Sequence, residues 1–220
     1  MSKPKVAIVI LQYNNSRDTI RCLNSVKELN YPDYSIIVVD NASSQHHFNN
    51  IRLFIENEQK TDARISHLLL SNDHNLGYSG GNNLGIKQAL RDGTDYVFIL
   101  NPDAVIEKNT LTKLVEAGES DAQTGIIGSA IKEHDRTVYG GKIEWLKPEL
   151  QHIYLEPKTY NLKPNTYLIG AAMLIKKSVI EKIGPLDERY FLYFEDADYC
   201  ARAQQAGIKL KIVTEALVSH

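Results

Sequence analysis

The stretch Lys5-Val-Ala-Ile-Val-Ile-Leu11 decides the fold, because it is short, rich in β-branched residues and without polar side chains after its first residue. Such a run is typical of a strand that is buried on both faces of a sheet. A second run of this kind is Ser35-Ile-Ile-Val-Val39. The segment between the two carries apolar residues at helical spacing, namely Ile20, Leu23, Val26 and Leu29. This order predicts a strand, a crossover helix and a parallel strand.

The same alternation continues along the chain. It predicts, in order, a weaker helix near residues 48–58, a strand at about Ile65–Leu70, a helix that ends near Arg91, and a strand at Tyr96–Leu100. Strands that alternate with helices favour a parallel α/β sheet, in which ligands bind beyond the carboxyl ends of the strands. Three polar stretches fall at that edge, Tyr13–Asn15, Asp40–Ser44 and Asn101–Asp103.

The second half of the chain is less regular. Residues 133–165 contain Trp145 and prolines at 148, 157 and 164, and they indicate an excursion such as a hairpin. The other expected elements are a strand at 125–131, a long strand at 166–175, a short helix capped by Ser178, a helix at 195–206 stopped by Gly207, and a strand at 209–213. No repeat or Ser/Gly linker interrupts the chain, so we expect one domain.

Composition and charge limit the functional classes. The 220 residues are 43% hydrophobic and 24% charged, which is typical of a globular domain and excludes a disordered or fibrous protein. A net charge of −2 argues against nucleic acid as a partner. Cys22 and Cys200 belong to no metal-binding pattern, so free thiols and a reducing cytosol are expected. The sequence has neither a signal-peptide core nor an apolar run of the ~20 residues that a membrane span needs, which predicts a cytoplasmic protein with peripheral membrane association at most.

Two aspartates directly follow predicted strands. Asp103, in Asn101-Pro102-Asp103, could ligate Mg²⁺ or Mn²⁺ together with substrate phosphates, although Asn-Pro-Asp is also ordinary turn chemistry. Asp40 could accept hydrogen bonds from a nucleobase or a ribose, or it could form a helix cap or an Asx-turn. The loop Asn75–Asn82 is rich in glycine and suits phosphate at a helix N-terminus, but it matches no complete phosphate-binding motif. The residues alone leave all of these alternatives open.

Three carboxylates, Glu195, Asp196 and Asp198, begin a predicted helix, where the helix dipole stabilises negative charge. Asp198 can pair with Arg202 four residues later, which leaves Glu195 and Asp196 without a local partner. A carboxylate next to the preceding aromatic run could be partly desolvated and act as a general base. Taken alone, the pattern favours ordinary chemistry of a helix N-terminus.

Five motifs stand in a definite order along the chain. They are Val6–Asn14, Val39–Ser43, Asn75-x-Gly77 with Asn82 and Gly85, Leu100–Asp103, and Phe194–Asp198 followed by Arg202 and Gly207. This order resembles the inverting family-2 glycosyltransferases over essentially the whole chain, and most of all the bacterial branch that includes rhamnosyltransferases. The resemblance implies the GT-A fold, a single Rossmann-like α/β/α domain over residues 1–220 with a mostly parallel central sheet. Residues 1–104 would bind the donor and residues 105–220 the acceptor.

The resemblance also implies a role for each motif. A nucleotide-sugar donor would be bound by Tyr13, Asn14, Asp40, Asn41, Gly77, Asn82, Asn101 and Asp103. Asp103 would bind a divalent metal, Mg²⁺ or Mn²⁺, on the diphosphate, and His220 would approach the same metal. Asp196 matches the catalytic base, and Glu195 would support it. The reaction would be a single displacement with inversion at the anomeric carbon.

The expected donor is dTDP-rhamnose or a UDP-sugar, and the expected acceptor is a hydroxyl of a saccharide or a lipid-linked saccharide. Because many relatives continue beyond the position of His220, we expect a chain that lacks part of the acceptor site or a membrane-associating segment. A nucleotidyltransferase is the first alternative, but the loop Gln12–Asn15 lacks the glycine and lysine that a triphosphate site needs. An inactive binding module is the second, and the retained carboxylates Asp103, Glu195 and Asp196 argue against it.

Overall fold

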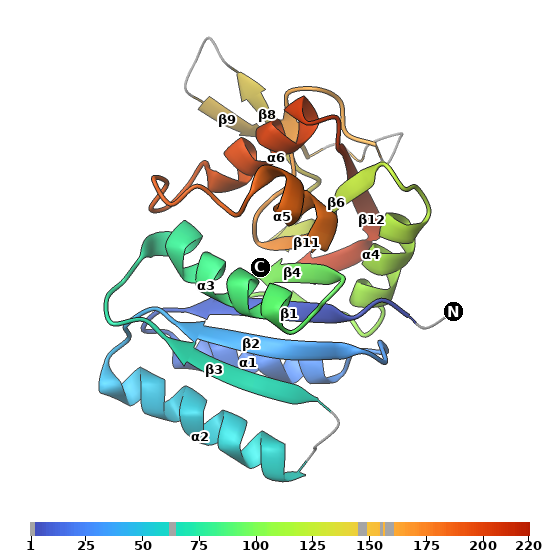
Figure 1. Ribbon diagram of the computed structural model, residues 1–220. Coiled ribbons are helices and arrows are strands. Elements are labelled where there is room, and N and C mark those ends of the chain that lie inside the picture. The colour runs from blue at the N-terminus through green and yellow to red at the C-terminus, as the bar shows by residue number, and fades with distance from the viewer. Residues whose placement is uncertain (1–2, 62–64, 145–148, 155, 157–160) are drawn as a thin grey trace.

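The computed structural model describes residues 3–61, 65–144, 149–154, 156 and 161–220 (Figure 1). Its main sheet is built, within these residues, from β1 (Val6–Gln12), β2 (Tyr34–Asp40), β3 (Ser66–Ser71), β4 (Tyr96–Leu100), β5 (Val105–Ile106), β6 (Thr124–Glu133), β7 (Arg136–Val138), β11 (Ala172–Lys176) and β12 (Lys209–Ser219). The strand order is β3-β2-β1-β4-β11-β6-β12-β5, and β7 pairs with β6. A smaller sheet holds β8 (Gly141–Glu144), β9 (Glu149–His152) and β10 (Thr166–Tyr167).

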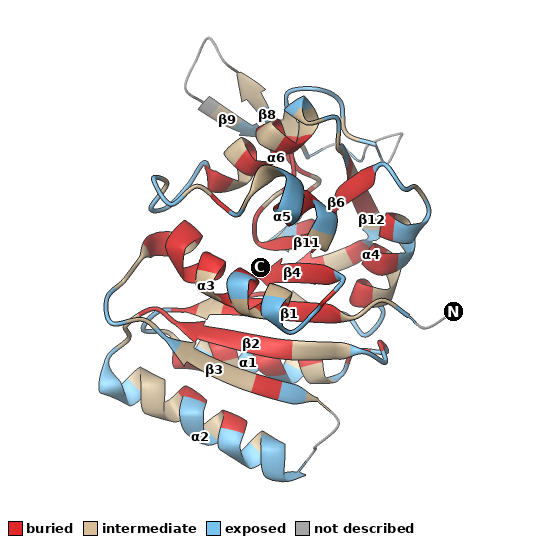
Figure 2. Cartoon of the chain, viewed as in Figure 1, coloured by how far each residue is buried: buried red, intermediate tan, exposed pale blue. Residues whose placement is uncertain are grey.

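Helices cover both faces of the main sheet, which makes three layers. They are α1 (Ser16–Lys27), α2 (Gln45–Thr61), α3 (Gly77–Arg91), α4 (Thr110–Glu119), α5 (Lys177–Ile183) and α6 (Glu195–Gln205). The side chains of β1 alternate between two apolar cores, as the two-residue period of a strand requires. Ile8 belongs to the core on one face, which includes side chains of α1, α2 and α4, and Val9 belongs to the core on the other face with side chains of α3. Figure 2 shows the resulting buried sheet between exposed helix faces, and β1 is buried on both faces as predicted.

Strand register brings the polar strand ends together. β1 pairs in parallel with β2 and with β4, so that Gln12 lies opposite Asp40 and Ile10 lies opposite Leu100. The polar residues that follow each strand therefore share one edge of the sheet, which confirms the placement predicted from the sequence. Parallel pairing also joins β2 to β3 and β6 to β12, whereas β11 runs antiparallel to both of its neighbours.

The predicted long strand at 166–175 is wrong, because the structure divides it into β10 and β11. Residues 168–171 leave the sheet between the two strands although their side chains are apolar and mostly buried. Ser178 is not the cap of the following helix: it lies inside α5, whose N-cap is Lys176. The helix at 195–206 and its stop are confirmed, because α6 ends at Gln205 and Gly207 has φ +76°.

Other elements extend the sequence prediction. α3 begins at Gly77, within the stretch expected to be a loop, and α4 and β5 were not predicted. The excursion after β6 includes the hairpin β8–β9, as expected, while Trp145, Pro148 and Pro157 lie outside the described residues. Among the residues described, no helix combines the length and the apolar character needed to cross a membrane.

Candidate active site

Asp40 lies in a network that joins the ends of β1 and β2. The residue is 2% exposed, its Oδ2 accepts a hydrogen bond from Gln12 Nε2 at 2.5 Å, and its Oδ1 accepts one from Ser43 N at 2.9 Å. Ser43 Oγ in turn accepts hydrogen bonds from Gln12 Nε2 at 2.8 Å and Asn14 N at 2.9 Å. These bonds hold the loop after β1 in one shape and leave the Tyr13 ring half exposed.

Asn41 fixes the loop that leads into α3. Its Nδ2 donates to Asn75 Oδ1 at 2.7 Å and to Gly77 O at 3.0 Å. Its Oδ1 accepts hydrogen bonds from Asn72 Nδ2 at 2.9 Å and Leu76 N at 3.1 Å. Because this buried amide makes four hydrogen bonds within the chain, it joins the end of β2 to the first turn of α3.

The first turn of α3 also contacts the loop before α6. Gly77 has φ +70°, and a Cβ atom on it would lie 2.3 Å from the carbonyl oxygen of Phe191. Tyr78 N donates to that same oxygen at 2.6 Å. One turn later Asn82 is buried inside the helix, where its Nδ2 donates to Tyr78 O at 3.0 Å. The absence of a side chain at Gly77 therefore lets the helix end lie beside the loop, while the Asn82 bond lies within α3.

We expect Gly77→Ala to destabilise the fold by about 2–4 kcal/mol, because the new Cβ meets a backbone oxygen in addition to the strain of a positive φ. Gly93→Ala is the matched control, since Gly93 has φ +72° but no atom within 4 Å of its Cβ position. The control variant should lose only about 1 kcal/mol of stability, because it suffers the strain of a positive φ without the clash. Urea unfolding of both variants measures the difference, and equal losses would contradict the predicted clash.

Asn101, Asp103 and His220 meet at the end of β4. His220 Nε2 lies 3.2 Å from Asp103 Oδ1 and 3.1 Å from Asn101 Nδ2. The hydrogen bond from His220 lowers the pKa of Asp103, and the same bond raises the pKa of His220. His220 is held at this place because β12 pairs with β6 and His220 N donates to Lys132 O at 3.0 Å. The structure thus brings together three residues that the sequence separates widely.

This cluster fits a divalent cation that takes further ligands from a substrate. The described residues contain no group of three or more His, Cys, Asp or Glu side chains placed to hold a metal ion. Asp103 nevertheless offers a carboxylate, His220 an imidazole, and Asn101 an amide oxygen that is buried without a hydrogen-bond partner. Such oxygen and nitrogen donors suit Mn²⁺, and oxygen donors suit Mg²⁺, which commonly binds one or two carboxylates plus phosphate oxygens.

Asp196 faces a cleft of about 460 Å³ between the end of β4, the β8–β9 hairpin and α6. The lining residues include Asn101, His152, Gly170, Leu192, Asp196 and His220. Asp196 Oδ2 accepts a hydrogen bond from Gly170 N at 3.0 Å, and its Oδ1 accepts one from Ala197 N at 2.7 Å. Burial raises the pKa of Asp196, and these two backbone donors act in the opposite direction. The carboxylate is thus held in place, on the same cleft as the Asn101 and His220 side chains.

Glu195 is the carboxyl next to Asp196 at the start of α6. It is 6% exposed, and its Oε2 has no hydrogen-bond partner among the described residues. Burial raises the pKa of Glu195 to about 7, and the neighbouring charge of Asp196 raises it as well. At neutral pH, Glu195 is therefore protonated to a greater extent than an exposed glutamate would be.

We expect Glu195→Gln to make the protein more stable than the parent at pH 8, by about 1–3 kcal/mol, and to leave stability nearly unchanged near pH 4.5. The folded parent binds this proton more tightly than the unfolded chain does, so its stability falls as pH rises from about 4.5, the ordinary value, to about 7. Urea unfolding at several pH values measures the change. Glu181→Gln on exposed α5 is the control, and a difference that does not vary with pH would contradict the prediction.

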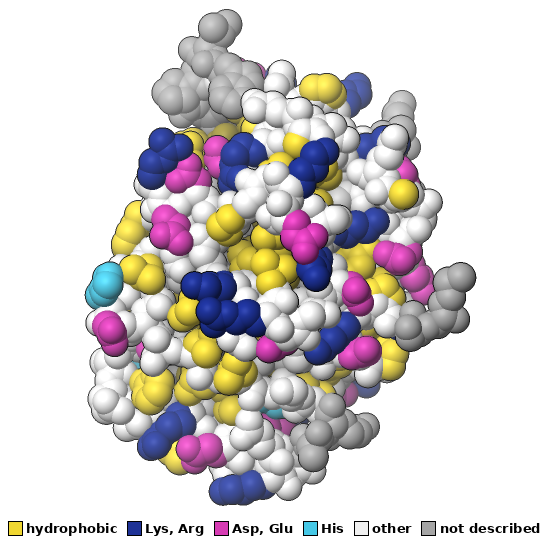
Figure 3. Space-filling view, in the orientation of Figure 1, with side chains coloured by type: hydrophobic (Ala, Val, Ile, Leu, Met, Phe, Trp, Pro, Cys, Tyr) yellow, Lys and Arg dark blue, Asp and Glu magenta, His cyan; other side chains and the backbone are white. Residues whose placement is uncertain are grey.

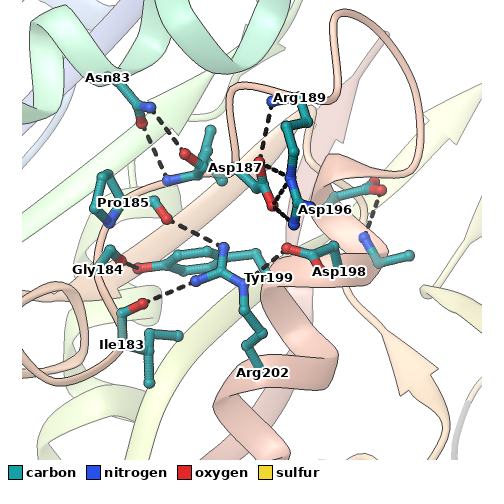
Figure 4. A network of polar contacts seen from close by, with 12 residues as sticks. Asn83, Ile183, Gly184, Pro185, Asp187, Arg189, Asp196, Asp198, Tyr199 and Arg202 are labelled. Atoms are coloured by element: carbon teal, nitrogen blue, oxygen red, sulfur yellow. Dashed lines mark hydrogen bonds and ion pairs between the residues drawn. The ribbon is translucent and has the colours of Figure 1, made fainter.

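Asp198 forms an ion pair with Arg202, as Figure 4 shows. Its Oδ2 pairs with Arg202 Nε at 2.8 Å, and Arg202 also donates to Ile183 O at 2.9 Å and to Pro185 O at 3.1 Å. This network ties α6 to the turn after α5. The acidic cluster therefore divides into Asp198, which stabilises the fold, and Asp196, which faces the cleft.

Several residues of the cleft were missed from the sequence. Gly170 orients Asp196 through its amide and accepts a hydrogen bond from Tyr78 Oη at 2.8 Å through its carbonyl. Leu150 and His152 reach the cleft from β9. No local motif marks these positions, because only the break between β10 and β11 and the folding of the hairpin bring them to Asp196.

Comparisons with known proteins agree on one family. The sequence model described as glycosyl transferase family 2 matches residues 7–184. The low-salt glycan biosynthesis hexosyltransferase of Haloferax volcanii is 30% identical over 213 residues, which cover 93% of this chain and 63% of that protein. The N-acetylglucosaminyl-diphospho-decaprenol L-rhamnosyltransferase of Mycobacterium tuberculosis is 28% identical over 180 residues, which cover 69% of this chain and 58% of the relative. The chain thus spans less than two thirds of the length of either relative.

Solved structures share the fold at lower identity. The mannosyltransferase of Pyrobaculum calidifontis in complex with GDP-Man and Mn²⁺ has a TM-score of 0.76 at 18% identity, with 100% of this chain and 57% of the other covered. GalNAc-T7 with UDP, GalNAc and Mn²⁺ has a TM-score of 0.79 at 17% identity, with 100% of this chain and 44% of the other covered. At this identity the likeness establishes the architecture.

Proposed function

Because this chain belongs to glycosyl transferase family 2, we propose that it transfers a sugar from a nucleoside-diphosphate sugar to a hydroxyl of a saccharide or lipid-linked saccharide. Its architecture is the GT-A fold that the sequence motifs predicted. The observation that carries the proposal is the cleft in which Asp196 shares one surface with Asn101 and His220. A fixed carboxylate and a candidate cation site on one cleft are what transfer from a diphosphate donor requires.

We assign the donor to the edge where β1, β2 and β4 end. The assigned residues are Tyr13, Asn14, Asp40, Asn41, Gly77, Asn82, Asn101 and Asp103. Because Asp40 and Asn41 are both 2% exposed and already bonded within the chain, we propose that they keep the two loops in shape. The half-exposed ring of Tyr13 would then contact the nucleotide base directly.

The proposed reaction is a single displacement. Asp196 takes the proton from the acceptor hydroxyl while that oxygen bonds to the anomeric carbon, the bond to the diphosphate breaks, and the configuration inverts. The two backbone donors on Asp196 keep its carboxylate aimed into the cleft, and Glu195 supports it from the adjacent position. Mg²⁺ or Mn²⁺ bound by Asp103, with Asn101 and His220, would offset the charge that develops on the departing diphosphate.

The names of relatives narrow the donor and the acceptor. A dTDP-rhamnosyl transferase of Shigella flexneri is 22% identical over 96% of this chain, which supports dTDP-rhamnose as donor. The relative from Haloferax volcanii is named a hexosyltransferase, which supports a hexose as the other candidate for the transferred sugar. The mycobacterial relative is named for a diphospho-decaprenol acceptor, which supports a lipid-linked saccharide as the acceptor and thus a position at a membrane surface.

Thermal unfolding with UDP, dTDP, GDP and CDP, each with and without Mn²⁺ or Mg²⁺, tests the donor assignment. A nucleotide at a hundred times its dissociation constant should stabilise the fold by about 2.7 kcal/mol, which raises Tm by several degrees. We expect this metal-dependent effect with dTDP or UDP, followed by release of the nucleoside diphosphate from the matching sugar donor. A protein that responds to none of the four nucleotides, or that releases pyrophosphate instead, would contradict the proposal.

A further inference from the structure

A short apolar loop stands at the mouth of the cleft. Its side chains Phe191, Leu192, Tyr193 and Phe194 are 58%, 52%, 70% and 45% exposed. They are four of the seven large hydrophobic side chains that are exposed in the described part of the chain. Single exposed apolar residues are normal on a protein surface, but four in succession mark a surface that another molecule covers.

The backbone holds this loop in its exposed shape. Phe191 O accepts a hydrogen bond from Tyr78 N at 2.6 Å, and Phe194 O accepts one from Asp198 N at 2.9 Å. Tyr193 and Phe194 both have φ +70°, a left-handed conformation that costs an aromatic residue about 1–2 kcal/mol. A loop that is strained, anchored at both ends and exposes its apolar side chains gains nothing for the isolated fold, which indicates a role in binding.

Two exposed cations lie on the helix to which the loop is anchored. Lys87 and Arg91 are exposed on α3 and have no ion pair or hydrogen bond within the described residues. Both line an apolar groove of about 680 Å³ that also includes Leu84 and Leu90. Figure 3 shows Lys and Arg side chains gathered over α3 with hydrophobic side chains around them. At 1.5 Å per residue, Lys87 lies ~15 Å along the helix from the turn that contacts the loop.

We propose that the loop 191–194 and the exposed side of α3 form one surface that docks onto a lipid bilayer with anionic head groups. The apolar side chains enter the interface, and Lys87 and Arg91 contact the head groups, as in other proteins that combine both signals. The inference rests on the proposed function, because the benefit of docking is that it brings the cleft to a lipid-linked acceptor. It goes beyond that function by naming the surface.

A saccharide acceptor alone does not account for this surface. Sugar stacking within the cleft would use Leu192, Tyr193 and Phe194, which line it, but it would not use Phe191, which does not. It would also not involve Lys87 and Arg91, which lie on a groove of α3 outside the cleft. A bilayer with anionic lipid engages both features at once.

Co-sedimentation with lipid vesicles tests the proposal. The probes are vesicles of phosphatidylcholine with and without phosphatidylglycerol, and the protein is the full chain. We expect binding to the anionic vesicles, about ten-fold weaker partitioning for Phe191→Ser on either vesicle, and about ten-fold weaker partitioning for the double variant Lys87→Gln/Arg91→Gln on anionic vesicles alone. Leu53→Ser is the matched control, because Leu53 is 51% exposed on α2, and Lys60→Gln on α2 is the control for charge.

Three outcomes would overturn the proposal. They are a parent protein that ignores both vesicles, a Leu53→Ser variant that loses as much binding as Phe191→Ser, or a dimer in solution that Phe191→Ser converts to a monomer. The nucleotide-dependent thermal shift is measured without vesicles, so it reports on the proposed function separately. A parent protein that binds no vesicle but shows a normal nucleotide shift rejects the docking surface alone, and a parent that binds vesicles but shows no nucleotide shift rejects the donor site alone.

Discussion

Asp196→Asn is expected to slow sugar transfer about 10²–10⁴-fold while nucleotide binding stays intact, because the amide cannot take a proton from the acceptor hydroxyl. The substitution keeps the shape of the side chain. Its single oxygen can satisfy only one of the two amides, of Gly170 and Ala197, that now donate to the carboxylate. We therefore also expect a loss of about 1–2 kcal/mol in stability, and rates are to be compared at equal concentrations of folded protein.

Asp198→Asn is the control that separates catalysis from folding. Asp198 lies on the same helical turn but pairs with Arg202, whose guanidinium also binds two carbonyls of the preceding turn. Removing its charge should lower the melting temperature and leave the transfer rate per folded molecule within a few-fold of the parent. If both variants lost activity in proportion to their stability, Asp196 would have a structural role only, and another base would have to be sought.

The raised pKa of Asp196 predicts how the rate of sugar transfer depends on pH. Burial raises the pKa of Asp196, and only its deprotonated form accepts a proton, so the rate should fall as pH drops through this raised value. Glu195, with a pKa of about 7, adds a second group that changes charge near neutral pH. A pH profile of Glu195→Gln should therefore keep the fall that belongs to Asp196, and its disappearance would move the base to Glu195.

The first half of the fold was predictable because buried parallel strands have a plain signature. Lys5–Leu11 and Ser35–Val39 are continuous apolar runs, and the sheet edge at which they end follows from their direction. The break at residues 168–171 had no such signature, because these residues are as apolar as the strands on either side. Hydrophobicity reports burial, and it does not distinguish a strand of the sheet from the floor of a cleft.

Some residues of the candidate site could likewise be predicted from the sequence, and others could not. Asp40 and Asp103 were found from their place after strands, which is a property of the local sequence. Asp196 was assigned as a base only by resemblance, because an acidic residue at a helix N-terminus is ordinary. The features that distinguish it are the amide of Gly170, 26 residues away, and a cleft that the hairpin closes. Such contacts depend on tertiary structure and leave no spacing pattern in the chain.

Asp103→Asn is expected to remove the metal-dependent part of nucleotide binding. Asn101 has a neutral side chain, so Asp103 supplies the negative charge of the cluster with Asn101 and His220. A neutral amide should weaken nucleotide binding in Mn²⁺ about 100-fold, since a divalent cation needs that charge. At the concentration that stabilises the parent by about 2.7 kcal/mol, the variant would gain about 0.4 kcal/mol. Thermal unfolding with and without the metal measures both values.

Asp18→Asn controls for the loss of a nearby acidic charge. Asp18 pairs with Arg21 at 3.4 Å, and Arg21 Nη2 also donates to the backbone oxygen of Asp103 at 3.1 Å. This half-exposed pair contributes about 0–1 kcal/mol, so the control should keep the full response to nucleotide and metal. If Asp103→Asn responded to Mn²⁺ as the parent does, the cation would bind without this carboxylate. The cation that offsets the charge on the departing diphosphate would then be held by other ligands, and the carboxylate at the end of β4 would have another role.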